Sequence, residues 1–433
     1  MTKKKKIIIL GAGLAGLSAA WHLSKKGGEY QIFEKEPEIG GLCRSKKTSG
    51  FTFDCDGHLL HFRYPYTFNL VRQLLEDNLV EHQRSSWIYA YSQYIRYPFQ
   101  ANLYGLPPKI IEECLLGFIE ASRNGLHVKK GPDTFLDWIY RTFGKGIAKH
   151  FMLPYNAKFW TVSPKKMTCE WLDGFIPVPC MDHVVEGAIE ESLRQFGYNS
   201  RFWYPKNGGI NALPLAFAKR IKNIHTNCGV ERIDIQKKEI TLSSGLKEKF
   251  DYLISTLPLP ELPQIIRGMP RETAKLFNKL KWNSIFNLNL GIEKTDRTKR
   301  HWVYFPDEDF CFFRAGFYHN FSSSLVPQDK SSLYIEVSYS REKPVDKNNL
   351  IPAIKKDLKR VGLMGEGDTV CAEDVNDIKY GYPIYDEHYA AVRSAIIKYL
   401  AKNAILPCGR YGSWRYFSME DTILDARHVA NTL

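Results

Sequence analysis

Residues 6–34 read KIIILGAGLAGLSAAWHLSKKGGEYQIFE, and this stretch decides the fold. The apolar run from Lys6 to Leu10 predicts a buried strand, and the apolar residues after the glycines predict a helix through Leu23. A second strand is expected from Tyr30 to Phe33. A strand, a crossover helix and a parallel strand form the βαβ unit that opens many α/β folds. The stretch therefore predicts a parallel sheet at the start of the chain.

The glycines between strand and helix form the pattern G-x-G-x-x-G at Gly11, Gly13 and Gly16. The first makes a tight turn, the second lets a pyrophosphate approach the backbone, and the third lets the helix pack on the strand. The helix N-terminus offers N–H groups and a partial positive charge to the phosphates. An acidic residue at the end of the second strand can bind ribose hydroxyls. The predicted dinucleotide contacts are Gly11, Gly13, Leu14, Ala15, Gly16, Glu34 and Lys35.

A second glycine pair favours FAD over NAD as the dinucleotide. Residues 34–45 have the arrangement E-x5-GG-x2-R-S, which resembles the glutathione-reductase-like FAD fold. That fold also has an adenine contact and a returning strand, which match Val230 and the stretch LISTL at 253–257. The predicted fold class is therefore α/β, with a discontinuous Rossmann domain that binds FAD. Gly41, Leu42 and Val230 join the predicted cofactor contacts.

Composition excludes several other classes of protein. The 433 residues are 44% hydrophobic and 25% charged, as in ordinary globular proteins, and no apolar run reaches the ~18 residues of a membrane-spanning helix. The net charge of +13 without a nucleic-acid motif favours a phosphorylated substrate and no nucleic acid. Nine cysteines without a CxxC pair predict reduced thiols, with neither a metal site nor disulfides. The apolar run after the N-terminal lysines is too short for a signal peptide, so a cytoplasmic location is expected.

The middle of the chain predicts a helical region and then a sheet. Residues 107–160 have helical periodicity, and Asp133 is expected to cap a second helix that Gly144 ends. Apolar residues alternate with asparagines at 286–290, and residues 333–339 alternate in the same way. This alternation predicts an antiparallel sheet with one covered face.

Seven short blocks in a fixed order resemble the UDP-galactopyranose mutase family, and its eukaryotic-type branch most closely. They are DCDGHLL, YPFQANL, FMLPYNAKFW with MTCEWL, YPKNGGI, WVYFP with FFRA, GYP, and GRYGSWRYFS. The resemblance implies three domains: an FAD-binding domain at 1–80, 203–262 and 402–433, an inserted helical bundle at 104–202, and an antiparallel β-sheet domain for the substrate at 81–103 and 263–401.

The resemblance also implies roles for single residues. His58 matches a histidine in a mobile loop beside the flavin, while Arg314 and Arg410 match the two arginines that hold the diphosphate. These three are the expected catalytic residues, and arginine suits the role because its planar fork pairs two phosphate oxygens. Gly409 and Tyr416 are expected beside the cofactor. The expected substrate contacts are Tyr97, Gln100, Phe151, Tyr155, Asn156, Trp160, Tyr304, Arg314, Tyr382, Arg410 and Tyr416.

The activity implied by the resemblance is that of an isomerase, which interconverts the pyranose and furanose forms of UDP-galactose or a related UDP-sugar. In the family, N5 of reduced FAD attacks the anomeric carbon, UDP leaves, and the flavin–sugar adduct rearranges without net redox change. No separate NADPH domain is found in the sequence, so NADPH or NADH would bind transiently as the reductant. A UDP-sugar is the expected partner, and homo-oligomerisation is left open.

Three stretches depart from the family pattern. Phe175 stands where the family has an arginine near the flavin and the sugar. The stretch from Gly174 to Gly197 diverges in part of the substrate lid, and residues 418–421 differ where the family places polar sugar contacts. The uridine and diphosphate positions thus match better than the sugar positions, which leaves the identity of the sugar open.

Two other functions compete with a mutase. An FAD-dependent oxidase or desaturase of the amine-oxidase or protoporphyrinogen-oxidase type shares the FAD fold, and YPKNGGI resembles its motifs too. Such enzymes often carry an apolar channel or a membrane-binding stretch, which the sequence does not show, and they have no use for a uridine pocket. The other alternative is a flavin- or nucleotide-binding protein without catalytic activity.

Overall fold

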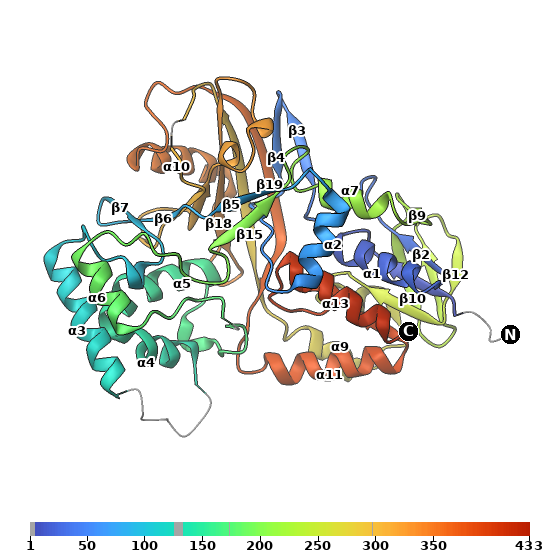
Figure 1. Ribbon diagram of the computed structural model, residues 1–433. Helices are drawn as coiled ribbons and strands as arrows, with labels where there is room; N and C mark the ends of the chain where they lie inside the picture. The colour runs from blue at the N-terminus through green and yellow to red at the C-terminus, as the bar shows by residue number, and fades with distance from the viewer. Residues whose placement is uncertain (1–4, 125–132, 173, 297) are drawn as a thin grey trace.

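A five-stranded parallel sheet has its strands in the order β20-β13-β1-β2-β9, and its strands β2 and β9 lie at the right of Figure 1. This computed structural model describes residues 5–124, 133–172, 174–296 and 298–433. Helix α1 (Leu14–Lys25) follows the first strand, and α13 (Met419–Asn431) packs beside it from the other end of the chain. The strands are β1 (Ile7–Leu10), β2 (Tyr30–Phe33), β9 (Ile224–His225), β13 (Tyr252–Ser255) and β20 (Ile405–Pro407). The predicted α/β fold class with a discontinuous Rossmann domain is confirmed.

Smaller elements surround this sheet. They include a four-stranded sheet in the order β12-β11-β10-β14 and two isolated strand pairs, β3–β4 and β5–β8. Within the described ranges, no helix combines the length and the apolar character needed to cross a membrane. The elements are β3 (Ser45–Thr48), β4 (Phe51–Asp54), α2 (Pro65–Leu75), β5 (Val80–Gln83), β8 (Arg201–Tyr204), α7 (Ala212–Ala218), β10 (Val230–Asp234), β11 (Glu239–Leu242), β12 (Lys247–Lys249), α8 (Leu262–Ile265), β14 (Ile266–Arg267), α9 (Arg271–Phe277), α11 (Tyr389–Lys402) and α12 (Gly409–Gly412).

The helical region follows the expected outline but differs in one detail. Thr134 rather than Asp133 caps the second helix, because its hydroxyl and the Asp137 carboxylate exchange hydrogen bonds with each other's backbone N–H. The first helical stretch ends at Gly144 as predicted, because the backbone there has a φ of 73° and a kink separates it from the short stretch that follows. The missing side chain of Gly144 also lets α3 approach. The helices are α3 (Pro108–Asn124), α4 (Phe135–Ile147), the π-helical turn η2 (Ala148–Met152), α5 (Leu153–Trp160) and α6 (Met181–Ile189).

A seven-stranded sheet has the order β19-β15-β18-β17-β16-β6-β7. Its neighbouring strands are antiparallel except for β16 and β6, which run parallel. The alternating stretches at 286–290 and 333–339 lie in two adjacent interior strands of this sheet, as predicted. Its strands are β6 (Ser86–Ala90), β7 (Gln93–Arg96), β15 (Trp282–Ile292), β16 (Trp302–Tyr304), β17 (Arg314–Gly316), β18 (Ser331–Tyr339) and β19 (Val370–Pro383).

The prediction of one covered face is wrong for β15 and β18. The apolar side chains of β15 and β18 pack on α10 (Lys347–Arg360), as expected. On the opposite face, however, Asn287, Asn289 and Glu336 are fully buried as well. They lie under the loop after β4, where Asn289 Nδ2 donates to the carbonyl oxygen of Asp54 at 3.1 Å. Polar side chains alternate with apolar ones here because they bind a loop, not because they face water.

Candidate active site

A cavity of about 1020 Å³ is lined by parts of the parallel sheet, the helical region and the seven-stranded sheet. Its walls come from the turn after β1, the loop after β4, helix α5, strands β16, β17 and β19, and the segment 409–419. Two residues of the predicted site, Gly16 and Trp160, lie outside these walls. The predicted residues that line the cavity are Gly11, Gly13, Leu14, Ala15, Glu34, Lys35, Gly41, Leu42, His58, Tyr97, Gln100, Phe151, Tyr155, Asn156, Val230, Tyr304, Arg314, Tyr382, Gly409, Arg410 and Tyr416.

Gly16 and Trp160 support the cavity from behind. A Cβ atom on Gly16 would overlap the carbonyl oxygen of Gly11, so this glycine serves the packing of α1 on β1. Trp160 is fully buried, and its ring centre lies 4.7 Å from that of Trp171 and 5.7 Å from that of Tyr416, which both line the cavity. Trp160 therefore holds the aromatic wall in place, and the prediction that it contacts the substrate directly has no support from its position.

The turn after β1 has the geometry of a phosphate cradle. Gly11 has a φ of 95°, and its N–H donates to the carbonyl oxygen of Phe33 at 2.8 Å, which ties the turn to β2. Glu34 follows directly, and its carboxylate accepts from the N–H groups of Ala12 at 2.7 Å and Glu36 at 3.0 Å. Because each carboxylate oxygen has two lone pairs, Glu34 keeps acceptor positions for ribose hydroxyls.

Two glycines leave the cradle open to a ligand. A Cβ atom on Gly13 would come no closer than 3.7 Å to its nearest neighbour, the Cα atom of Gly41, so its open side is not filled by protein. The N–H of Gly40 donates to the carbonyl oxygen of Ala12 at 2.8 Å and brings the second glycine turn against the first. Arg44, which lies in the quoted motif but was not predicted as a contact, donates from Nε to the Gly41 carbonyl oxygen at 2.9 Å. This bare cradle at a helix N-terminus fits the pyrophosphate of FAD.

Arg314 lies opposite Glu336 on the neighbouring strands β17 and β18. Arg314 Nε donates to Glu336 Oε2, and Nη2 donates to Oε1 at 2.6 Å. The Glu336 side chain is fully buried, whereas 18% of the Arg314 side chain is exposed. Burial opposes the charge of Arg314, but the Glu336 carboxylate outweighs this effect and raises the pKa of Arg314 well above its ordinary value. Glu336 was not predicted as a site residue, although its place in the alternating stretch 333–339 was a signal for it.

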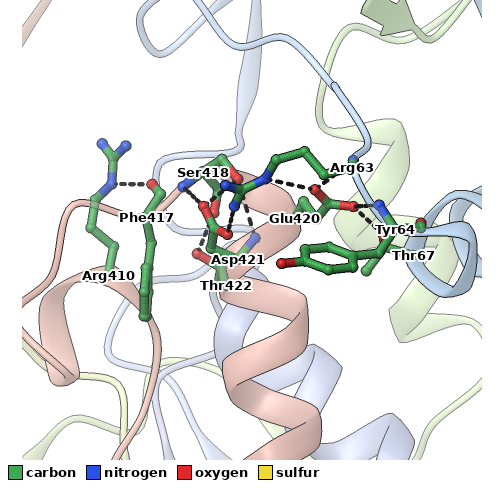
Figure 2. Close-up of polar contacts among 9 residues, drawn as sticks. All are labelled: Arg63, Tyr64, Thr67, Arg410, Phe417, Ser418, Glu420, Asp421 and Thr422. Carbon is green, nitrogen blue, oxygen red and sulfur yellow. Dashed lines mark hydrogen bonds and ion pairs between the residues drawn. The ribbon is translucent and has the colours of Figure 1, made fainter. Parts of the chain in front are cut away.

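Arg410 approaches the same end of the cavity from α12. Its Nε donates to the carbonyl oxygen of Phe417 at 2.7 Å, and Figure 2 shows its Nη groups directed away from that contact. The guanidinium carbon lies 5.1 Å from the ring centre of Tyr382 and 5.6 Å from that of Tyr416. Burial raises the pKa of Tyr382 well above its ordinary value, and the charges of Arg314 and Arg410 both counteract this rise. Arg410 therefore lies beside Tyr382 in the cavity that Arg314 also lines.

His58 is a neutral imidazole in this charged surrounding. Burial lowers its pKa below the ordinary value, Asp56 counteracts this, and the charges of Arg410 and Arg314 lower it further. Its Nδ1 lies 3.2 Å from the carbonyl oxygen of Asp56, which can only accept, so Nδ1 carries the proton. Nε2 of the neutral ring is therefore an acceptor.

Parallel aromatic rings form the predicted uridine end. Phe99, Phe151 and Tyr155 are stacked, with ring centres 5.1 Å and 5.3 Å apart and interplanar angles of 6° and 8°. Phe151 and Tyr155 both line the cavity, so these near-parallel rings form an aromatic part of its wall. Gln100 donates from Nε2 to the carbonyl oxygen of Pro177 at 2.6 Å, while its buried Oε1 has no hydrogen-bond partner among the described residues. The pocket therefore holds an unused acceptor.

The predicted sugar end is aromatic. The Phe175 ring lies 4.8 Å from that of Tyr416 and 5.4 Å from that of Tyr198, in edge-to-face arrangements. His61, which lines the cavity and was not predicted, lies 5.2 Å from the Tyr198 ring, and burial lowers its pKa to about 4. The guanidinium carbon of Arg63 lies 5.7 Å from the ring centres of both Phe175 and Tyr198, so this aromatic wall carries a positive charge beside it.

The polar residues at 418–421 bind the protein itself (Figure 2). Ser418 caps α13 and donates from Oγ to Asp421 at 2.7 Å. The guanidinium of Arg63 pairs with Asp421, and its Nε lies 3.5 Å from Glu420. Glu420 also accepts from the backbone N–H groups of Arg63 at 2.8 Å and Tyr64 at 3.1 Å. The carboxylates of Glu420 and Asp421 thus fix Arg63 and Tyr64, which follow His58 in the chain, to the start of α13.

Comparison with protein families assigns the chain to a class. The family model of flavin containing amine oxidoreductases matches residues 14–433, so the protein belongs to this family. The family is flavin-containing, which implies FAD as the cofactor of this chain.

One solved structure and two curated proteins show how individual proteins resemble the chain in structure and in sequence. The crystal structure of reduced UDP-galactopyranose mutase superposes with a TM-score of 0.93 at 28% identity, over 99% of this chain and 93% of that chain. The 4,4'-diapophytoene desaturase (4,4'-diapolycopene-forming) of Methylomonas sp is 50% identical over 78% of this chain and 74% of its own length. The 4,4'-diapophytoene desaturase (4,4'-diaponeurosporene-forming) of Staphylococcus aureus strain MRSA252 is 23% identical over 90% and 84%. The structural neighbour is a mutase, whereas the two curated relatives are desaturases.

Proposed function

We propose that the protein is a flavin-dependent UDP-sugar mutase, which interconverts the pyranose and furanose forms of UDP-galactose or a related UDP-sugar. The observation that carries the proposal is that Arg314, Arg410 and Tyr382 line one cavity, with the guanidinium of Arg410 5.1 Å from the ring centre of Tyr382. Two guanidinium groups and a phenol match the charge and the acceptor oxygens of a diphosphate. The similarity to the solved mutase supports the same activity.

The predicted uridine end supports a pyrimidine ligand. Uracil presents one N–H donor between two carbonyl acceptors, so it needs an acceptor flanked by donors. Gln100 offers the unused acceptor Oε1 in a buried wall, next to the stacked rings of Phe151 and Tyr155. A buried acceptor without a partner costs about 1–3 kcal/mol, which a bound uracil would recover.

The residues would divide the work around the leaving group. Reduced flavin, when bound, supplies the nucleophile for the anomeric carbon. Arg314 and Arg410 neutralise the charge that develops on the departing diphosphate. Tyr382 stays protonated, because burial raises its pKa, and can donate to a phosphate oxygen. Phe175 and Tyr416 narrow the sugar end and exclude water there.

The reduced cofactor is the active form in this proposal, with NADPH or NADH as the transient reductant. Arg314 on β17 and Arg410 on α12 would hold the diphosphate from two different elements. The diphosphate therefore stays in the site while the sugar rearranges. The reaction has no net redox change, so the reductant is needed once and not in every turnover.

A desaturase or oxidase is the second candidate, and the two curated relatives favour it. The cavity also has an apolar side, to which Ile265 and Ile378 contribute. An apolar substrate, however, would displace water from the guanidinium groups of Arg314 and Arg410 without supplying an anion, even though Arg314 also pairs with Glu336 and Arg410 with the carbonyl oxygen of Phe417. The charged end of the cavity therefore favours the mutase.

Binding of UDP separates the two candidates. UDP is titrated into the FAD-loaded, oxidised protein while the flavin absorbance is recorded, with Arg410→Ala as the matched variant. A mutase site predicts a saturable spectral change that the variant weakens by at least 10-fold. Formation of UDP-galactofuranose from UDP-galactopyranose by the reduced protein, followed by chromatography, then tests the activity. A protein that leaves UDP unbound and oxidises an apolar substrate instead would establish the second candidate.

A further inference from the structure

Lys158 is a buried cation on α5 that lies behind the cavity wall. The residue is 6% exposed, and its neighbours on the helix, Asn156 and Phe159, line the cavity while Lys158 does not. Burial lowers the pKa of Lys158 to about 8, so the ammonium form prevails at pH 7. A buried charge is costly unless polar partners satisfy it, and the partners of Lys158 therefore indicate its role.

Three carbonyl oxygens of one loop surround the ammonium group. Lys158 Nζ donates to the carbonyl oxygens of Phe305 at 3.0 Å and Phe312 at 3.1 Å, and also to that of Asp307. An ammonium group has three donors and no acceptor, so these contacts use all of its donors. The loop at 305–313 thus closes around Lys158 in the way that backbone carbonyls close around a bound metal cation.

Helix α10 contacts the same loop. Asp357 on α10 accepts from the backbone N–H of Cys311 at 3.0 Å. The charges of Asp307 and Asp357 favour the charged form of Lys158, whereas that of Lys343 opposes it. The loop is therefore fastened by α10 through a carboxylate and by α5 through an ammonium group.

The two ends of this loop carry predicted ligand contacts. Tyr304 ends β16, Arg314 begins β17, and the two residues are register partners that both line the cavity. On α5, Tyr155 lines the same cavity, and its ring centre lies 5.4 Å from that of Tyr304 in an edge-to-face arrangement. Lys158 therefore joins the helix that carries Tyr155 to the loop between Tyr304 and Arg314.

A ring contact also joins α5 to this loop. The ring centres of Phe159 and Phe313 lie 5.2 Å apart in an edge-to-face arrangement. Hydrogen bonds depend more steeply on distance and angle than contacts between rings do. The three hydrogen bonds of Lys158 are therefore the contacts that fix the loop most narrowly against the helix.

We propose that Lys158 serves as an internal cation that positions Tyr304 and Arg314 against α5 and thereby sets the geometry of the diphosphate site. The proposal rests on the proposed function, because it takes the ligand to be UDP or a UDP-sugar. Lys158 is a positioning residue, since it does not line the cavity. Its effect depends on its charge and its three donors, and not on the volume of its side chain.

Replacement of the cation by a small molecule tests this dependence. Lys158→Ala removes the side chain beyond Cβ, and n-propylammonium supplies the missing atoms. UDP is titrated calorimetrically into the FAD-loaded, oxidised variant with and without n-propylammonium at constant ionic strength. The variant should bind UDP at least about 10-fold more weakly than the wild type, as expected when a charged phosphate contact is misplaced. Saturating n-propylammonium should restore the affinity to within about 3-fold of the wild type.

Neutral replacements separate the charge from the volume. 1-Propanol has the same chain length without the charge and should leave the affinity of Lys158→Ala unchanged. Lys158→Met keeps the apolar volume without a donor, so it should bind UDP weakly and should not respond to n-propylammonium. Lys149→Met is the matched control, because Lys149 on the adjoining turn η2 is 65% exposed and pairs with Glu113. It should bind UDP like the wild type.

Amide hydrogen exchange tests the position of the loop without UDP. Exchange of residues 305–313, followed by mass spectrometry, should be faster in Lys158→Ala and Lys158→Met, and n-propylammonium should slow it again in Lys158→Ala alone. FAD retention shows that each variant is folded. If Lys158→Ala loses FAD, the comparison of Lys158→Met with Lys149→Met decides the question.

The outcomes separate this inference from the proposed function. Exchange that is unchanged in the Lys158 variants overturns the inference and leaves the mutase proposal intact. Faster exchange with wild-type affinity for UDP, or equal rescue by 1-propanol, has the same meaning. Wild-type protein that does not bind UDP overturns the proposed function, and with it the role of Lys158 in ligand binding.

Discussion

The carboxylate of Glu34 accepts a hydrogen bond from the backbone N–H of Ala12 at 2.7 Å, which fastens the end of β2 to the turn between β1 and α1. Both elements of the cofactor cradle are thereby held in one position before any ligand arrives. Gly13, the next residue, then faces the cavity without a side chain. The cradle is preorganised, so substitutions inside it should act on the ligand and not on the fold.

Gly13→Val tests this distinction. A Cβ atom at Gly13 has its nearest protein neighbour at 3.7 Å, so the variant should fold, but its side chain occupies the place of the pyrophosphate. FAD retention after gel filtration should be lost while the circular dichroism spectrum stays unchanged. Gly16→Ala provides the contrast, because a Cβ there overlaps Gly11 and should destabilise the protein itself. Full FAD occupancy in Gly13→Val would contradict the site.

Activity should depend on reduced flavin without consuming the reductant. This follows from the proposed isomerisation, in which substrate and product have the same oxidation state. Turnover of UDP-galactose is compared between dithionite-reduced and oxidised protein, and the NADPH spent per product is counted. Equal activity in the oxidised form, or one NADPH per product, would favour the oxidase or desaturase.

Arg410→Ala should weaken UDP binding by roughly 10- to 150-fold, since a charged hydrogen bond contributes about 1.5–3 kcal/mol. Arg314→Lys should weaken it as well, because an ammonium group cannot satisfy both Glu336 oxygens and a phosphate. Arg314→Lys is a better test than Arg314→Ala, because alanine would leave the Glu336 charge buried without its partner. Calorimetric titration of UDP measures both. Wild-type affinity in both variants would refute the diphosphate site.

Phe175→Ala should leave UDP affinity within about 2-fold but change the preference among UDP-sugars. The Phe175 ring packs against Tyr416 and Tyr198 at the sugar end, away from Gln100 and the stacked rings. Dissociation constants for UDP, UDP-galactose and UDP-glucose are compared between the variant and the wild type. Parallel changes for all three ligands would show that Phe175 does not select the sugar.

Asp54 should make stability fall as the pH rises from 4 to 6. Burial raises its pKa from 3.8 to about 6, although Ser45, Tyr204 and the N–H of Ile210 donate to it. The folded protein therefore keeps a proton that the unfolded chain releases first, and this contribution, on the order of 3 kcal/mol, is lost above pH 6. The free energy of unfolding of wild type minus that of Asp54→Asn should decrease across this range. A difference that does not vary with pH would contradict the raised pKa.

The sequence predicts the parts of the fold that local patterns encode. A strand, three glycines and an acidic residue place β1, α1 and β2 correctly, because periodicity and turn chemistry act over a few residues. The pairing of Arg314 with Glu336 depends on the register of two strands, which sequence spacing does not contain. Sequence spacing also does not contain the position of a side chain relative to a cavity, so it could not show that Trp160 lies behind the wall. Family motifs therefore predict which residues lie near the cavity. The contacts of each residue depend on strand register and on whether its side chain lines the cavity or lies behind the wall.

The parallel sheet takes its edge strand β20 from residues 405–407, although β1 begins at residue 7. The parallel sheet that contains β1 can therefore be completed only after nearly the whole chain has been synthesised on the ribosome. Contacts of such long sequence separation form late in folding. Incomplete chains would expose the apolar residues of β1 to other chains. Binding of FAD would then indicate that synthesis has passed β20.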